Sequence, residues 1–503
     1  MKLKNIFGLA LLFTMALFMQ SCSDSDSSST KATALSVTKD GEEVEALNFQ
    51  VSQSSQMIGI KTDGDWKVSI PDADTTWLSI TPHEGYGWAI NDSSATNSKA
   101  YVRVTVQKNT GESRSSAITV TAGALTKVVT VTQSGHGLDP NDPFESAYSL
   151  VENIKIGYNL GNTLECDPCV ATSSWIDFSK GTSAWETAWG QPVTTQETLD
   201  SIAAKGFNIV RVPVTWFPHM DENGDVDETW MNRVQEVVDY VINTGSYCVL
   251  VVQHDAGAGD ASRGDSAAWL TADPDKYATN SVRFKHLWTQ IANRFKDYDQ
   301  HLIFDGFNEI LNKEWSWTAP SDGNDASYAT INKLLQDFVD AVRATGGNNE
   351  YRNLLLDCYG SGSTQVVIDA LQVPTDVHPN HLLLSVHSYD PYWFCNDTDG
   401  KKEYDYYIYS FDSNCKTEID NIFTRVDKRC SDLNIPYIFG EFGAIGEHPD
   451  MAERIKYAQY MTSKFKAYHT SGLWWMGLYD RSTKNWYESE IVDALLQGMG
   501  VTK

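Results

Sequence analysis

The sequence has few basic residues for its length. Its 503 residues include 39 Lys and Arg against 66 Asp and Glu, a formal net charge of −27. A surface this acidic repels phosphate backbones, so we expect no nucleic-acid partner. After the N-terminal segment there is no apolar run of 18 residues or more, so we expect no membrane-spanning helix. Hydrophobic residues make up 41% and charged residues 21%, which is typical of a globular protein.

Motifs for metal and phosphate binding are also missing. Cys166 and Cys169 form a C-x-x-C pair, but no second pair follows at zinc-ribbon spacing. His254, His286 and His387 do not show a spacing such as H-E-x-x-H, and we expect no metal and no cofactor.

The chain has only eight cysteines. Outside the cytosol, Cys166 and Cys169 could form a local disulfide, and Cys415 could pair with Cys395 or with Cys430. Cys248 and Cys358 lie in apolar runs and are interpreted as small buried hydrophobic residues. No cysteine is predicted to be catalytic.

The first 21 residues indicate a targeting segment. Lys2 and Lys4 precede an apolar run over 6–19, which is too short to remain as a spanning helix, and Cys22 follows. This arrangement resembles a bacterial lipoprotein signal peptide over 1–21, with lipidation at Cys22. The alternative is ordinary secretion with an unmodified cysteine.

Residues 22–34 are rich in Ser and Asp, which predicts a flexible tether. Acidic residues directly after the cysteine resemble the surface-export signal of outer-membrane lipoproteins. We therefore expect an outer-membrane lipoprotein at the cell surface, attached through its lipid alone, with a periplasm-facing position as the alternative. We expect the protein to be a monomer.

Residues 35–135 predict a small all-β sandwich. Short runs such as Tyr101–Val106 and Lys127–Gln133 alternate apolar with polar residues, and turn residues separate them. The segments Asp65–Val68, Thr76–Ile80 and Val129–Gly135 resemble the BACON domain, an immunoglobulin-like module of surface glycan-degrading lipoproteins. The resemblance implies either a carbohydrate binder or a spacer, and we favour the spacer.

The tryptophans of this region are Trp66, Trp77 and Trp88. We interpret them as core or corner residues rather than as a platform for sugars.

After a linker at 136–144, the pattern of hydrophobic residues changes: over 145–503, short apolar runs are separated by segments with helical periodicity. The segment Thr195-Gln196-Glu197 begins a helix that Gly206 ends, and further helices are expected around 230–242 and 334–342. Eight runs predict strands: 154–159, 208–212, 248–252, 302–307, 354–358, 382–386, 437–440 and 473–477. Eight β–α repeats fit a (β/α)8 TIM barrel, whose active site forms at the carboxyl ends of the strands. A doubly wound sheet is the alternative, but the first strand lacks a Gly-rich phosphate loop.

Polar residues follow most of these runs, and two carboxylates stand out. Glu309 follows the fourth run, and Glu441 follows the seventh. Strands four and seven lie roughly across a barrel from each other, so both side chains could reach one substrate. Glycosidic cleavage needs one carboxyl group to protonate the leaving oxygen and a second to act at the sugar carbon.

Several motifs resemble glycoside hydrolase family 5. They are Phe307-Asn308-Glu309-Ile310, Gly440-Glu441-Phe442-Gly443, His387-Ser388-Tyr389 and Arg211-Val212-Pro213-Val214. Gly157–Leu164 and Trp185–Gly190 resemble its subfamily 4, and the likeness covers nearly all of 145–500.

The resemblance implies a retaining endo-β-1,4-glucanase with Glu309 as general acid/base and Glu441 as nucleophile. It implies substrate-binding or orienting roles for Arg211, Asn162, Gln253, His254, Asn308, His387, Tyr389 and Trp475 (or its neighbour Trp474). Arg211 would keep Glu441 ionised, Asn308 would bond the sugar 2-hydroxyl, and Trp475 would stack under the sugar.

Two positions depart from the family pattern. Gln253 stands where the family usually has the first histidine of His-His-Asp, and Met476 follows the last tryptophan pair in place of Asp-Asn-Gly. The expected substrate is a β-glucan: xyloglucan, mixed-linkage glucan or a cellulose-type polymer. A mannanase or xylanase with the same two glutamates, an inert surface glycan-binding protein and a zinc hydrolase are the alternatives.

Overall fold

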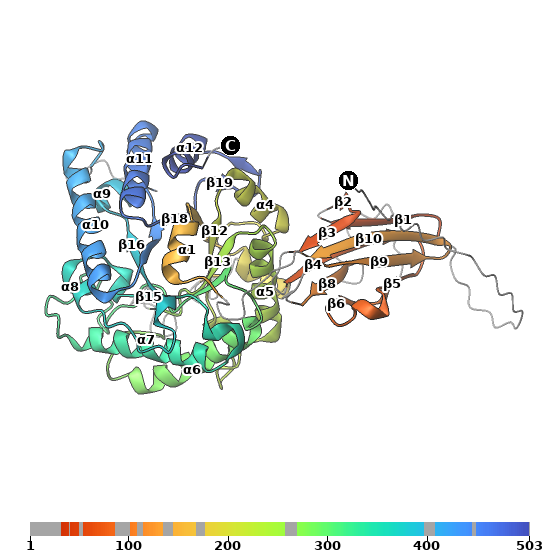
Figure 1. Cartoon of the computed structure of the whole chain (residues 1–503), viewed down its shortest axis with the longest axis horizontal. Coiled ribbons are helices and arrows are strands. Elements are labelled where there is room, and N and C mark those ends of the chain that lie inside the picture. Colours follow the sequence, from red (N-terminus) through yellow and green to blue (C-terminus); the bar gives the residue numbers. More distant parts are fainter. Residues whose placement is uncertain are drawn as a thin grey trace, which may run out of the picture.

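The computed structural model describes residues 32–39, 41–49, 54–85, 101–107, 114–133, 144–166, 177–256, 269–396, 408–444 and 449–501. The predictions on the signal segment, Cys22, Trp88, Cys169 and nearly all of the tether and linker lie outside these residues. Figure 1 shows two bodies, a β-sandwich and a barrel ringed by helices. No helix within the described ranges is long and apolar enough to cross a membrane.

The smaller body consists of two five-stranded sheets. One has the order β2-β1-β4-β8-β6 and the other the order β3-β10-β9-β5-β7. The strands are β1 (Leu35–Lys39), β2 (Glu42–Glu43), β3 (Ala46–Phe49), β4 (Ser54–Thr62), β5 (Trp66–Ser69), β6 (Leu78–Thr81), β7 (Glu84–Gly85), β8 (Tyr101–Val106), β9 (Arg114–Ala122) and β10 (Leu125–Gln133). The predicted all-β sandwich is confirmed.

The core of this sandwich is formed by strands whose residues alternate between buried and exposed positions. In β5 and β6, every second residue is buried, and β8 buries Val102, Val104 and Val106. Successive side chains of a strand point to opposite faces, so one face of each sheet supplies the interior. Trp66 and Trp77 are buried, as the sequence predicted.

The larger body is a closed barrel of eight parallel strands. They are β11 (Gly157–Asn159), β12 (Ile209–Val214), β13 (Tyr247–Val252), β14 (Leu302–Asp305), β15 (Leu354–Asp357), β16 (Leu382–Ser388), β17 (Tyr437–Phe442) and β18 (Gly472–Trp475). β11 pairs with both β12 and β18, which closes the ring. The predicted (β/α)8 barrel is confirmed, and the doubly wound alternative is wrong.

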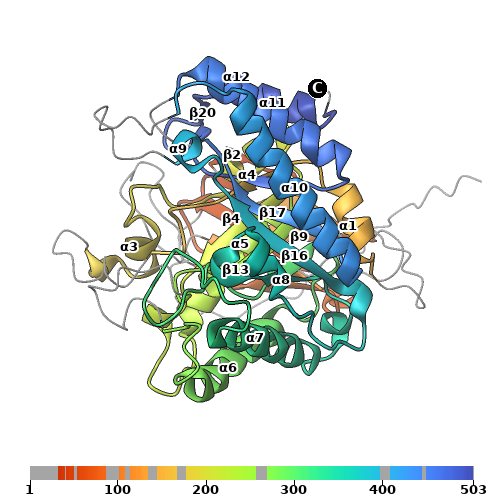
Figure 2. The ribbon, with the colours of Figure 1, turned by 90° about the vertical axis from the view of Figure 1, so that its left-hand side faces the viewer.

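Helices surround the barrel, as Figures 1 and 2 show. They are α1 (Ala147–Asn153), α3 (Thr182–Glu186), α4 (Gln196–Lys205), α5 (Glu228–Ile242), α6 (Tyr277–Phe295), α7 (Ala326–Arg343), α8 (Gln365–Asp369), α9 (Tyr392–Cys395), α10 (Ser413–Leu433), α11 (Met451–Ala467) and α12 (Ser489–Gly498). Gly206 follows α4 with φ +122°, a backbone region that favours glycine, so this helix ends where the sequence predicted.

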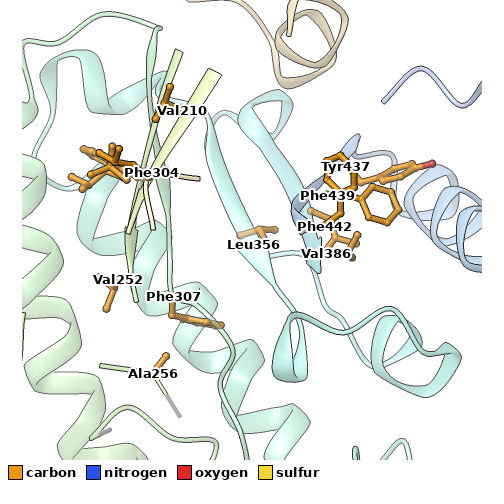
Figure 3. Packing of buried hydrophobic residues seen from close by; sticks show 14 of the residues in the cluster. Val210, Val252, Ala256, Phe304, Phe307, Leu356, Val386, Tyr437, Phe439 and Phe442 are labelled. Carbon is orange, nitrogen blue, oxygen red and sulfur yellow. The ribbon is translucent and has the colours of Figure 1, made fainter. Parts of the chain in front are cut away.

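The main apolar core lies between the strands and these helices. Figure 3 shows Val386 of β16 beside Tyr437, Phe439 and Phe442 of β17. Phe439 packs against Phe423 of α10, with ring centroids 4.8 Å apart, and further rings from α11 complete the layer. This packing fixes β17, the strand that carries Glu441.

The sandwich and the barrel meet at α5. The amide and the hydroxyl of Ser55 in β4 donate to Asp239 Oδ2 of α5 at 3.1 and 2.8 Å. Tyr298 also donates to Asp239, and Arg103 of β8 donates to the Ser55 hydroxyl. Asp239 is fully buried at this junction, and the desolvation raises its pKa to about 7.

The predicted pairing of Cys415 with Cys395 or Cys430 is wrong, because all three cysteines are free. Cys415 and Cys430 lie fifteen residues apart on α10, and a rise of about 1.5 Å per residue separates them far beyond disulfide reach. Cys395 contacts the Asp390 carbonyl instead. The Cys166–Cys169 pairing stays a prediction, since Cys169 lies outside the described residues.

Candidate active site

Glu309 and Glu441 come together at the carboxyl end of the barrel. Glu309 lies just beyond β14, and Glu441 is the fifth residue of β17. A carboxylate oxygen of each lies within 4.8 Å of the other. Two carboxyl groups this close fit the retaining arrangement of glycosidases, which needs about 5–5.5 Å, and not the wider inverting one.

Glu441 is held in its charged form. Arg211 Nη1 donates to its Oε1 at 2.8 Å, and the Tyr389 hydroxyl donates to its Oε2 at 2.9 Å. Burial alone would raise the pKa of this carboxyl group, but His387, Arg211 and Tyr389 together hold it below its ordinary value. Burial and the two nearby carboxylates raise the pKa of Tyr389, so this hydroxyl stays a donor.

His387 lies between the two carboxyl groups. Its Nδ1 is 2.8 Å from Glu309 Oε1 and 3.7 Å from Glu441 Oε2. A Cβ at Gly440 would approach His387 Nε2 to 3.1 Å and the Ser385 hydroxyl to 2.4 Å. Position 440 therefore needs glycine for the imidazole to keep its place.

Arg211 is oriented from three sides. Its Nε contacts Asp305 Oδ2 at 3.2 Å, its Nη1 reaches Asn159 Oδ1 at 3.3 Å, and its Nη2 donates to Asn308 Oδ1 at 3.0 Å. The Asn159 amide in turn donates to the main chain of β17 and β18. The predicted Asn308 is thus bonded to Arg211, and a role toward the sugar stays a prediction.

From the sequence, Asn159 is recognised only as a polar residue at a strand end with no assigned role, and Asp305 and Asp357 were not singled out. All three are fully buried. Asp305 interrupts an apolar run four residues before Glu309, and Asp357 ends another apolar run. A charged residue inside an otherwise apolar strand is the signal that could have identified both aspartates.

Gln253 and His254 follow β13. Gln253 is buried, and its Oε1 has no hydrogen-bond partner among the described residues. The His254 ring meets Trp189 edge to face at 5.5 Å. The neighbouring Asp255 has a structural role, because it accepts from the Trp216 and Phe217 amides and the Trp269 indole.

Asn162 lies in the loop after β11, and Trp475 is the last residue of the neighbouring strand β18. The backbone of Asn162 has φ +55°, and its amide donates to the buried carboxylate of Glu165. Desolvation raises the pKa of Glu165 to about 7. A Cβ at Gly161 would lie 3.3 Å from the Trp475 ring, so the loop carrying Asn162 touches this tryptophan. Their contacts to sugar stay predictions.

Several exposed aromatic side chains lie in segments that follow barrel strands. Trp317 follows β14, Tyr392 and Trp393 follow β16, and Tyr487 lies in the segment after β18. Large exposed aromatic side chains are costly to leave in water, and their flat faces suit the stacking of sugar rings.

The described residues contain one cluster whose atoms could jointly hold a metal ion, formed by Glu309, His387 and Glu441. Each member already has a hydrogen-bonding partner within the cluster or beneath it. His254 packs on Trp189, and His286 bonds Asp225 instead. His254, His286 and His387 thus contact different partners and do not form a common site. The pairing of His387 with the two glutamates favours acid–base chemistry.

Comparisons with known proteins agree with this geometry. The family description "Cellulase (glycosyl hydrolase family 5)" matches residues 171–479, and a BACON description, "Putative binding domain, N-terminal", matches residues 65–134.

Endoglucanase A of Ruminococcus albus is 31% identical over 368 residues, covering 70% of this chain and 92% of that protein. The xyloglucan-specific endo-beta-1,4-glucanase BoGH5A of Bacteroides ovatus is 28% identical over 530 residues, 98% of this chain and 96% of that protein. The solved structure of PbGH5A from Prevotella bryantii B14, a mutant in complex with a xyloglucan tetradecasaccharide, is 39% identical. It has a TM-score of 0.63 and covers 71% of this chain and 99% of that one.

The family description spans more than half of the chain, and the three relatives named above are each covered over more than 90% of their length. The chain belongs to glycoside hydrolase family 5.

Proposed function

We propose that this glycoside hydrolase is a retaining endo-β-1,4-glucanase whose preferred polymer is xyloglucan. The observation that carries the mechanism is the approach of Glu309 and Glu441 to within 4.8 Å, with Arg211 and Tyr389 bonded to Glu441. This geometry suits a nucleophile at Glu441 and a proton donor at Glu309.

The reaction has two displacements. Glu441 attacks the anomeric carbon while Glu309 gives its proton to the glycosidic oxygen, so the bond to the leaving sugar breaks as the bond to Glu441 forms. Glu309 then takes a proton from water, the water oxygen bonds to the same carbon, and Glu441 leaves as a carboxylate. Two inversions restore the original configuration.

The choice of xyloglucan rests on the relatives. BoGH5A, which matches this chain through both bodies, is xyloglucan-specific, and PbGH5A was solved with a xyloglucan oligosaccharide. The exposed Trp317, Tyr392 and Trp393 follow barrel strands β14 and β16, and their flat faces suit a long substrate that lies across the barrel mouth.

Product analysis on a polymer panel tests this function. We expect the highest kcat/KM on xyloglucan, lower values on mixed-linkage glucan and carboxymethyl cellulose, and little cleavage of mannan or xylan. Proton NMR of the first product should show the β-anomer, and a chelator should leave the rate unchanged. Faster cleavage of mannan or xylan, or an α-anomer as the first product, would contradict the proposal.

We also propose that Cys22 is lipidated and holds the enzyme at the outer membrane, facing the cell exterior. Support comes from the basic and apolar segment before Cys22 and from the acidic tether after it. Replacing Cys22→Ala should move the protein out of the membrane fraction, because acyl-chain burial supplies the attachment. Ser25→Ala is the matched control, and digestion of the enzyme by protease added to intact cells distinguishes the exterior from the periplasm.

We propose that the sandwich is a spacer and that the barrel works as a monomer. All the site residues described above come from barrel elements of one chain. Removing residues 31–134 should leave turnover of short soluble oligosaccharides nearly unchanged. A large fall in kcat would mean that the sandwich contributes to the site, and light scattering checks the monomer.

A further inference from the structure

The layer directly beneath Glu441 holds more acidic than basic side chains. Arg211 of β12, Asp305 of β14 and Asp357 of β15 are all fully buried, and Glu441 is nearly so. Asp305 pairs in register with Leu355, so Asp357, two residues further along β15, points to the same face of the sheet. Three carboxyl groups therefore share one guanidinium in the barrel interior.

The hydrogen bonds of Arg211 do not reach Asp357. Its donors go to Asp305 Oδ2, Glu441 Oε1, Asn159 and Asn308. Among the described residues, Asp305 Oδ1 and both oxygens of Asp357 have no partner within hydrogen-bond distance. The buried Ser361 hydroxyl, which also has none there, is a side-chain donor near Asp357, and it lowers the pKa of Asp357 less than burial and Asp305 raise it. Burying two carboxylates side by side with no donor between them costs much free energy. One proton shared between the two groups removes the repulsion and supplies a donor to the oxygen that lacks one.

We propose that Asp357 carries a proton and donates it to Asp305 Oδ1, so that Asp305 remains an anion and fixes Arg211 beneath the nucleophile. Asp357 is then a positioning residue that acts through Asp305 and Arg211. The guanidinium faces two carboxylates, Asp305 and Glu441, instead of three.

The direction of titration agrees with the geometry. Burial and the neighbouring Asp305 raise the pKa of Asp357 well above its ordinary value. The charged and titratable groups gathered here are Arg211, Asp305, Asp357, His387, Glu309, Tyr389 and Glu441. When Asp357 is neutral, fewer anions face Arg211, so the guanidinium stabilises the carboxylate form of Glu441 more strongly. The mechanism requires that form.

Two matched amide variants test the assignment of the proton. In Asp357→Asn, the neutral amide of asparagine replaces the neutral, protonated carboxyl group as hydrogen-bond donor. The value of kcat/KM should therefore stay within about threefold, and the acidic limb of the pH profile of kcat/KM should not move. Asp305→Asn removes an anion that competes for Arg211, so the acidic limb should move to lower pH. The more firmly paired Glu441 is a weaker nucleophile, and kcat should fall by at least about tenfold.

The other outcomes overturn the proposal. If the proton lies on Asp305, the two variants exchange their effects. If both carboxyl groups are ionised, both variants move the acidic limb to lower pH. This kinetic part rests on the proposed function.

A measurement on the resting protein is independent of activity, and its first part uses the native chain alone. The native chain, labelled with carbon-13 in the aspartate side-chain carboxyl, should show the infrared C=O stretch of a protonated carboxyl at pH 8.5. Asp239, with a pKa of about 7, is mostly ionised there. The band should disappear in Asp357→Asn, and its absence from the native chain would overturn the proposal whatever the enzyme hydrolyses.

Discussion

The sandwich and the barrel are both built from β-strands around an apolar interior, but they bury different polar groups. In the described part of the sandwich, the buried polar residues are uncharged: Thr38, Ser55, Gln56, Thr62 and Gln133. The barrel interior buries Arg211 with Asp305, Asp357 and Glu441. Buried ionisable groups are costly and seldom add net stability, so a cluster of them directly beneath Glu441 indicates that the barrel, rather than the sandwich, carries the chemistry.

The strand patterns differ in the same way. Sandwich strands such as β5 alternate buried and exposed residues, whereas β12, β13 and β17 are buried at every position. A barrel strand has helices on one side and the interior on the other, so neither side faces water. The inward positions near the carboxyl end are therefore free to carry reactive groups held by many neighbours.

The largest expected effect comes from removing either glutamate of the barrel. Glu441→Ala and Glu309→Ala should each lower hydrolysis of the polymer by at least about a thousandfold, while the thermal midpoint changes little. An aryl glucoside with a good leaving group sharpens the assignment, because bond cleavage then needs no acid. Glu309→Ala should still release the aryl group in a burst, and Glu441→Ala should not. A burst from Glu441→Ala alone would reverse the roles.

By contrast, replacing a buried residue of the sandwich should lower stability and leave catalysis unchanged. Trp66 is almost fully buried, and Trp66→Ala should cost about 3–5 kcal/mol of sandwich stability. Calorimetry measures the loss, and kcat/KM on a short soluble oligosaccharide should equal that of the native chain. The surface variant Lys67→Ala is the control, and a fall in kcat/KM parallel to the loss of stability would show that the two bodies are coupled.

The junction between the bodies should make stability depend on pH. Asp239 has a pKa of about 7 in the fold against an ordinary value of 3.8. Between about pH 4 and pH 7 the folded chain holds a proton that the unfolded chain has released, so this group lowers stability as pH rises through that window. Asp239→Asn should remove up to about 1.4 kcal/mol per pH unit from the slope of unfolding free energy. Urea titrations at several pH values measure it, and an unchanged slope would contradict the assignment.

The smallest expected effect concerns Gln253. Its buried Oε1 has no partner within the described part of the chain, and Gln253→His restores the residue that the family usually carries there. An amide still donates a hydrogen bond but carries no charge, and Glu309 handles the essential proton. The change in kcat/KM should stay below about tenfold, or roughly 1.4 kcal/mol. A gain of several orders of magnitude would show that the native barrel is a repurposed family member.

Local patterns in the sequence determined the architecture and the acid pair. Eight apolar runs predicted all eight barrel strands, because a strand buried on both sides must be apolar along its length. Glu309 and Glu441 were identifiable because each follows such a run, and the barrel brings the carboxyl ends of its strands to one face. The alternation of Tyr101–Val106 similarly predicted a sandwich strand.

Only the tertiary structure decided which distant side chains meet. Ser55 and Asp239 are separated by 184 residues, and nothing in either segment signals the other. Asp305 lies within one apolar run and Asp357 near the end of another. Neither was singled out from the sequence, and their common face depends on the register of β14 against β15. Cys415 and Cys430 are close in sequence, yet the rise of α10 keeps them apart. Periodicity reports which face of an element is buried, whereas pairing between elements depends on register, barrel closure and docking, which no local pattern encodes.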